Sequence, residues 1–389
     1  MCRFMIYKGK DPMVLSDLLT KPAHSIINQS FDSRLRLDMR NPINGDGFGV
    51  GYYTDKNLPC IFKAITPAWN NVNLNNLSQC TQSHLVFGHV RASTQGVLSE
   101  SNCHPFSFGK IMFMHNGGIS SFNLIKKKLI NHIEDEFFIY IQGSTDSECC
   151  FALFLDTLYK MGYNPNDLNL QISHSILKQA LLTTIELIKN WQCEITQEPS
   201  LLNFAVTDGE SIVVSRYITS RTDEAASLHF STGSKFFEYQ PGLFKMERLN
   251  RSQDVIFVAS EPLTFERGDW ICVPTNTIIT ITSKNTVLMH PIRDEFYDDE
   301  GTIERSSGLA MRKGLIGGVP TMADNNNNGS DEDLPIHIHH PSNGDLIDNE
   351  SIDEVDSSIA EVPPLAREGR KSIVSDLDRR RTNDGESVY

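Results

Sequence analysis

The chain opens with MCRFMIY at residues 1 to 7, and this stretch decides how the rest is interpreted. Its apolar and aromatic residues predict a strand over residues 2 to 7. Cys2 follows Met1 directly, and cysteine is small enough to permit removal of Met1. A thiol and a free α-amine would then share one residue, and an α-amine that titrates at about pH 8 can accept the thiol proton. Alone this is weak evidence of catalysis, because many proteins with cysteine at position 2 are not enzymes.

Four further segments supply polar side chains suited to one reaction: NGDGFGVGYY at 44 to 53, GHVRAST at 88 to 94, HNGG at 115 to 118 and STDSE at 144 to 148. Each has an ordinary explanation when it stands alone. An isolated arginine usually joins a surface ion pair, Asn-Gly-Gly usually forms a turn, and an aspartate near a helix start usually caps it. Five such segments in one chain are difficult to explain as coincidence.

In order and spacing, these segments resemble the glutaminase domain of class II glutamine amidotransferases, the N-terminal-cysteine branch of the Ntn-hydrolase superfamily. The resemblance covers about residues 2 to 290. It implies Cys2 as the nucleophile, and an oxyanion hole made by the Asn116 side-chain amide and the Gly117 backbone N–H. It also implies that Arg91 binds the substrate α-carboxylate and that Asp146 binds the α-amine.

Thr94 and His104 match positions that shape and close the pocket in this family. The resemblance requires no metal and no organic cofactor. The run HIHH at 337 to 340 lacks fixed companion ligands, so we interpret any metal binding there as adventitious. The glycines of residues 44 to 53 do not form a phosphate-loop pattern, and we interpret them as strand glycines that permit close packing.

Strands and helices occur in separate runs, which predicts an α+β fold rather than a doubly wound sheet. Candidate strands are 47 to 53, 84 to 90, 110 to 115, 203 to 207, 211 to 217, 255 to 259 and 277 to 282; candidate helices are 145 to 161 and 174 to 191. The Asp208-Gly209 turn predicts a hairpin and a largely antiparallel sheet. With the resemblance, this gives a four-layer αββα sandwich over residues 2 to 295. The polar, apolar-poor residues 300 to 389 predict a disordered C-terminal tail.

Composition excludes several classes of protein. The formal net charge of −14 argues against a nucleic-acid partner. No stretch approaches 18 consecutive apolar residues, which argues against a membrane span. The eight cysteines contain no C-x-x-C pair, so they predict reduced thiols in a cytoplasmic protein rather than a zinc or disulfide framework.

The substrate is left open between glutathione and glutamine, because both carry the same γ-linked amino-acid end. The predicted tail has no room for a domain that uses ammonia. Together with the stretch VASEPLTFERGDWICVP at 258 to 274, the motifs resemble the stand-alone, YafJ-like branch of the class II family. Within that branch they resemble the subunits that cleave the γ-glutamyl bond of glutathione in partnership with a peptidase-family protein. The alternatives are a glutaminase that supplies ammonia to a separate synthase, and a non-catalytic binding subunit on the same fold.

Overall fold

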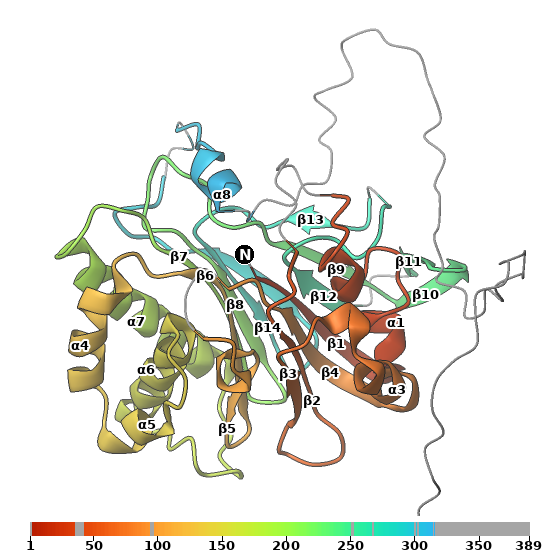
Figure 1. Cartoon of the computed structure of the whole chain (residues 1–389), viewed down its shortest axis with the longest axis horizontal. Coiled ribbons are helices and arrows are strands. Elements are labelled where there is room, and N and C mark those ends of the chain that lie inside the picture. Colours follow the sequence, from red (N-terminus) through yellow and green to blue (C-terminus); the bar gives the residue numbers. More distant parts are fainter. Residues whose placement is uncertain are drawn as a thin grey trace, which may run out of the picture. The chain divides into compact units, whose positions relative to one another are not determined.

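The computed structural model describes residues 2–35, 43–93, 97–249, 253–266, 268–298, 301, 303–313 and 315. Within these residues two antiparallel sheets lie face to face, with helices on both outer sides (Figure 1). In spatial order the seven-stranded sheet contains β13 (Ile271–Cys272), β9 (His229–Gly233), β12 (Val255–Ala259), β1 (Arg3–Val14), β4 (Gln82–Val90), β2 (Phe48–Tyr52) and β3 (Cys60–Ala64). The six-stranded sheet contains β15 (Val287–Pro291), β14 (Thr277–Ile281), β8 (Ile212–Arg216), β7 (Leu201–Thr207), β6 (Ile111–Gly118) and β5 (Phe106–Phe108).

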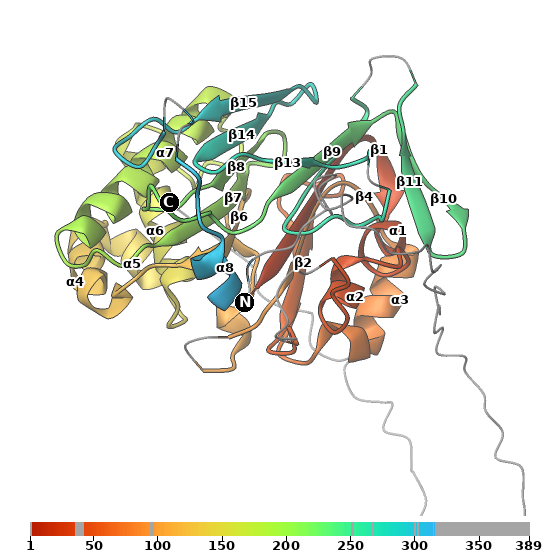
Figure 2. The same ribbon diagram turned by 90° about the horizontal axis from the view of Figure 1, so that it is seen from above.

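The helices form the two outer layers (Figure 2). The six-stranded sheet is covered by α4 (Phe122–His132), α5 (Asp135–Tyr140), α6 (Asp146–Lys160) and α7 (His174–Cys193). The seven-stranded sheet is covered by α1 (Leu15–Leu19), α2 (Ile26–Gln29), α3 (Val72–Cys80) and the hairpin of β10 (Lys235–Gln240) and β11 (Leu243–Glu247). Two short 3-10 turns, η1 (Ala68–Asn70) and η2 (Glu100–Asn102), and the helix α8 (Gly308–Arg312) complete the described elements.

Strand β1 shows why the sequence forms a sandwich. Its side chains alternate between two apolar environments, because successive residues of a strand point to opposite faces. Phe4 and Ile6 pack between the two sheets, whereas Met5 and Tyr7 pack beneath α1 and α3. A strand with both faces buried belongs at the centre of a layered fold. The predicted αββα sandwich is confirmed.

The two predicted helices and the predicted hairpin are confirmed. Thr145 caps the start of α6, where its side chain accepts a hydrogen bond from the Glu148 backbone N–H at 3.4 Å. The Glu148 carboxylate accepts from the Gln142 and Gly143 backbone N–H groups. β7 and β8 pair antiparallel, with Thr207 opposite Ile212. Gly209 in the turn between them adopts a φ of 93°, a conformation that favours glycine.

The chain after residue 300 differs from the prediction. We expected the disordered tail to begin at about 300, but residues 303–313 and 315 pack against the domain. Leu309, Ala310 and Leu315 are buried in an apolar cluster with Leu201 and Ile218. A segment with only a few apolar residues is ordered here because the sandwich already provides their partners. From residue 316 onward, the predicted tail lies outside the described residues, and the domain boundary at 295 stays a prediction.

Candidate active site

Cys2 lies at the start of β1, beside the end of β4. Arg3 pairs with Val90, so the antiparallel register places Cys2 opposite Arg91. The Cys2 Sγ atom lies 3.7 Å from the Ala92 carbonyl oxygen. Burial raises the pKa of the Cys2 thiol, although the positive charges of the chain start and of Arg91 oppose this. The thiol is therefore protonated at neutral pH and needs a base to become a nucleophile.

The Arg91 guanidinium is buried and oriented by its own loop. Its Nη1 donates to the Asp46 carbonyl oxygen at 3.3 Å, and its Nη2 donates to Ser93 Oγ at 3.1 Å. The Arg91 backbone N–H donates to the Gly47 carbonyl oxygen at 2.8 Å. Asp46 and Gly47 belong to the segment just before β2, so the glycine-rich motif and the GHVRAST motif meet at Arg91.

Asn116 and Gly117 lie at the end of β6, opposite Asn203 and Leu202 of β7. The Asn116 Nδ2 atom lies 3.1 Å from Ser260 Oγ, and the Phe4 backbone N–H donates to the same oxygen at 3.1 Å. One hydroxyl thus links the end of β6 to the residue two positions after Cys2. The predicted oxyanion pair is therefore connected through Ser260 to the strand that begins after Cys2.

Asp146 is the first residue of α6 and faces the end of β6. Its Oδ2 accepts from the Ile119 backbone N–H at 2.9 Å, and its Oδ1 accepts from Ser147 Oγ at 3.1 Å. Ser147 Oγ also lies 2.9 Å from His115 Nδ1, while His115 Nε2 lies 3.0 Å from the Leu201 carbonyl oxygen. Asp146 is close enough to Cys2 for its charge to act on the thiol pKa. The carboxylate is thus held between the helix start and β6.

The chain is similar to a known protein family and to several known proteins. A family model described as "Glutamine amidotransferases class-II" matches residues 15–295. The chain belongs to this family. A Saccharomyces cerevisiae relative named "Probable glutamine amidotransferase DUG3" is 64% identical over 330 residues, which cover 82% of this chain and 92% of that protein.

Two further matches extend the comparison. The "Gamma-glutamyl-hercynylcysteine sulfoxide hydrolase" of Mycolicibacterium smegmatis is 29% identical over 118 residues, which cover 30% of this chain and 51% of that protein. A solved structure of a class-II glutamine aminotransferase domain protein from Silicibacter pomeroyi aligns with a TM-score of 0.50 and 22% identity, covering 75% of this chain and all of that one. The structural match supports the fold alone.

A buried network of charged and polar side chains holds Arg3, the residue after Cys2. Arg3 Nε contacts Glu261 Oε1 at 2.5 Å, and His24 Nε2 lies 3.7 Å from Glu261 Oε2. Ser33 Oγ donates to Glu261 at 2.5 Å, and Arg3 also donates to Asn44. Burial opposes ionisation of Glu261, but Arg3 and His24 hold its pKa below the ordinary value. The start of β1 is therefore held by a charged group from the end of β12.

His104 and Thr94 were predicted to shape the pocket. The His104 ring is buried, with its centroid 4.1 Å from that of His89 and 4.6 Å from that of Phe106. Its Nδ1 accepts from the His115 backbone N–H at 3.4 Å. Burial lowers the pKa of His104 well below its usual value, so the ring is neutral. The His104 ring thus contacts β6, the strand that carries the HNGG motif. Its contact with substrate stays a prediction. Thr94 lies outside the described residues.

No role was predicted for Ser260, Glu261, Ser147 or His115. All four lie in motifs that were singled out, which was the available signal. Their roles depend on partners distant along the chain: Ser260 contacts a side chain 144 positions away. Hydrogen bonds of this kind leave no local pattern, because a buried serine looks the same in sequence whatever it contacts.

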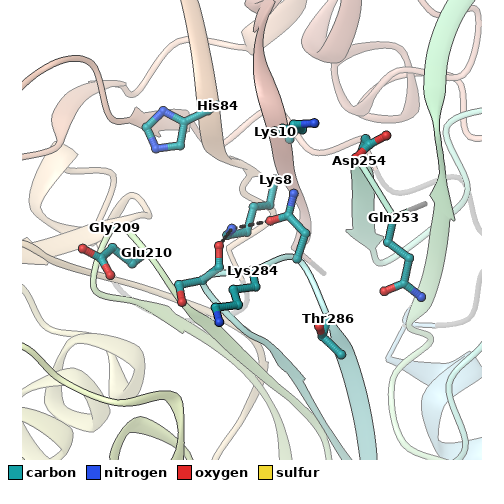
Figure 3. A pocket seen from close by; sticks show the side chains of 12 residues that line it. Lys8, Lys10, His84, Gly209, Glu210, Gln253, Asp254, Lys284 and Thr286 are labelled. Carbon is teal, nitrogen blue, oxygen red and sulfur yellow. Dashed lines mark hydrogen bonds between the residues drawn. The ribbon is translucent and has the colours of Figure 1, made fainter.

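A cavity of about 800 Å³ lies away from this site, beside the middle of β1 (Figure 3). Lys8, Lys10 and His84 line it together with the β7–β8 and β14–β15 turns. Lys8 Nζ donates to the Ser283 carbonyl oxygen at 3.3 Å and to Asn285 Oδ1, and burial lowers the pKa of Lys8 to about 8. None of the predicted site residues in the described part of the chain lines this cavity.

Among the described residues, no group of three or more His, Cys, Asp or Glu side chains could hold a metal ion. No helix in the described part of the chain is long and apolar enough to cross a membrane. The HIHH run at 337 to 340 lies outside the described residues.

Proposed function

We propose that this protein is a cytoplasmic γ-glutamyl amidohydrolase that cleaves glutathione to glutamate and Cys-Gly, with Cys2 as its nucleophile after removal of Met1. We further propose that it works in a complex with a peptidase-family protein. The placement of Cys2 at the start of β1, of Arg91 and Asn116 at the ends of β4 and β6, and of Asp146 at the start of α6 carries the proposal. Each group supplies one requirement of amide hydrolysis.

Substrate binding uses two opposite charges. The Arg91 guanidinium has a planar set of donors that suits a carboxylate. The Asp146 carboxylate, held by the Ile119 N–H, suits an ammonium group. A γ-glutamyl compound carries both groups on its α-carbon, and its γ-carbonyl then extends toward the nucleophile. The two charged side chains therefore recognise the amino-acid end of the substrate, and they place no constraint on the leaving group.

The reaction proceeds through a thioester. The α-amine of processed Cys2 takes the thiol proton, and the thiolate attacks the γ-carbonyl carbon. Asn116 Nδ2 and the Gly117 N–H stabilise the negative oxygen of the tetrahedral intermediate. The C–N bond then breaks and the leaving amine takes the proton from the α-ammonium. Water, deprotonated by the α-amine, hydrolyses the thioester to glutamate and restores the thiol.

The choice of leaving group draws support from the relatives. The M. smegmatis protein is named for hydrolysis of a γ-glutamyl compound in which the glutamyl group is joined to a cysteine derivative. Glutathione presents the same kind of linkage. The name of the S. cerevisiae relative, a glutamine amidotransferase, supports the second candidate, a glutaminase that passes ammonia to a separate synthase.

The test uses full chain isolated from its native cell under conditions that retain bound proteins. Intact mass shows whether Met1 is absent, and a diazo-ketone glutamine analogue should label Cys2 alone. Cys2→Ala should abolish both labelling and turnover, whereas Cys80→Ala, which changes an exposed thiol on α3, should change neither. Faster turnover of glutathione than of glutamine supports the peptidase. Faster turnover of glutamine supports the glutaminase, and full activity in Cys2→Ala contradicts both.

A further inference from the structure

Among the described residues, the Asn116 carboxamide has a partner at only one of its two ends. Its Nδ2 lies 3.1 Å from Ser260 Oγ. Its Oδ1 is buried, and nothing in the described ranges donates a hydrogen bond to it. A buried carbonyl oxygen without a donor is rare, because it has lost its bonds to water and gained none in return. The unpaired oxygen indicates that this side chain has a second arrangement in the working enzyme.

Ser260 can supply that arrangement. A serine hydroxyl carries one proton and two acceptor positions. The Phe4 backbone N–H occupies one acceptor position, and no acceptor in the described part of the chain takes the hydroxyl proton. Half a turn of the Asn116 carboxamide exchanges Oδ1 and Nδ2 without changing the shape of the side chain. Ser260 then donates to Oδ1, and both Nδ2 protons are available elsewhere.

We propose that Ser260 is a positioning residue of the oxyanion hole: its hydroxyl holds Asn116 Oδ1 and thereby directs Nδ2 to the carbonyl oxygen that Cys2 attacks. This inference rests on the proposed function, in which Asn116 is an oxyanion donor. In the opposite orientation the free end of the carboxamide is Oδ1, whose lone pairs repel a developing negative charge. The hydroxyl thus decides whether Asn116 helps or opposes the reaction.

The backbone of Ser260 is itself fixed from two sides. Its N–H donates to the Phe4 carbonyl oxygen at 3.0 Å, and its carbonyl oxygen accepts from Ser227 Oγ at 2.9 Å. Because Phe4 is two residues from Cys2, the serine that orients the oxyanion donor is also bonded to the nucleophile strand. Ser260 therefore sets the position of the donor relative to the thiol.

A double-mutant cycle tests this role. Ser260→Ala, Asn116→Ala and the double variant are made in the full chain, isolated from the native cell with its bound proteins, and assayed with L-glutamine and glutathione. We expect Asn116→Ala to lower kcat by about 100- to 1,000-fold. Ser260→Ala should lower kcat by about tenfold or more with KM changed less than about twofold, and should have almost no further effect in the Asn116→Ala background.

Two control variants separate positioning from folding. Ser260→Thr keeps the hydroxyl and should retain most of kcat. Ser231→Ala removes another buried serine hydroxyl, one without a hydrogen-bond partner among the described residues, and should leave kcat unchanged. Normal kcat in folded Ser260→Ala, or an equal loss with and without Asn116, overturns the positioning role and leaves the proposed function standing. Normal kcat in Asn116→Ala overturns the oxyanion assignment itself.

Discussion

Replacing Gly117 with alanine should damage both folding and catalysis, whereas the same change at Gly118 should be tolerated. A Cβ atom at Gly117 would lie 1.9 Å from the Leu201 carbonyl oxygen and 2.7 Å from His115 Nε2. At Gly118 the nearest atom is Asp146 Oδ2 at 3.7 Å, an ordinary contact. Two neighbouring glycines of one motif therefore differ sharply in the space available to a methyl group.

The magnitude follows from the displacement that the methyl group forces. A carbon normally approaches a carbonyl oxygen no closer than about 3.3 Å, so β6 and β7 must separate locally by about 1.4 Å. Overpacking of a buried site costs about 1–3 kcal/mol, and the upper end applies because the obstructing atom belongs to the backbone. For a domain of about 300 residues, a loss of about 3 kcal/mol lowers Tm by about 5 °C. An oxyanion donor displaced by about 1 Å loses about 100-fold in kcat.

Thermal unfolding and steady-state hydrolysis of the two variants form the assay. Gly117→Ala should show a lower Tm and a lower kcat, and Gly118→Ala should keep a Tm close to that of the wild type. If the two variants unfold at the same temperature and turn over substrate equally, the close approach of Leu201 to Gly117 is not a constraint, and the steric argument is refuted.

Two further predictions concern the parts of the fold that surround the site. The depressed pKa of Glu261 contributes stability that is present above its unfolded pKa of about 4.5 and is lost as the pH falls through the folded pKa. Glu261→Gln should therefore flatten the profile of stability against pH below about pH 5. At neutral pH the same change should lower the free energy of unfolding by about 3–5 kcal/mol, because Arg3 stays buried without its counter-charge. Denaturant unfolding at several pH values measures both effects, with the exposed Glu194→Gln as control; equal profiles contradict the network. Leu309→Ala should cost about 2–3 kcal/mol by thermal unfolding, because Leu309 is 8% exposed in an apolar cluster. The same change at Leu288, which is 36% exposed, should cost less than about 1 kcal/mol, and equal losses would show that α8 does not stabilise the domain.

Much of the fold could be predicted from local patterns, and the misses have physical causes. The helices at Asp146–Lys160 and His174–Cys193 and the turn at Gly209 carry signals within a few residues: a cap, an apolar stripe and a glycine. The β10–β11 hairpin and α8 carry weaker signals and were missed. Their order comes from contacts with a sheet or a cluster that already exists, as with Leu309 against Leu201. The hydrophobic periodicity of a segment does not indicate which distant residues it will contact.

The candidate site divides in the same way. The family and the chemical types of Cys2, Arg91, Asn116 and Asp146 were determined by the sequence, because a reaction needs those side chains and motifs record them. Only the tertiary structure decided that Ser260 bonds both Asn116 and the strand of Cys2, and that Gly117 lies against the Leu201 carbonyl. Side-chain chemistry is a property of the residue and can be read from its letter, whereas the direction of a hydrogen bond and the room for a methyl group depend on atoms that folding brings from elsewhere in the chain.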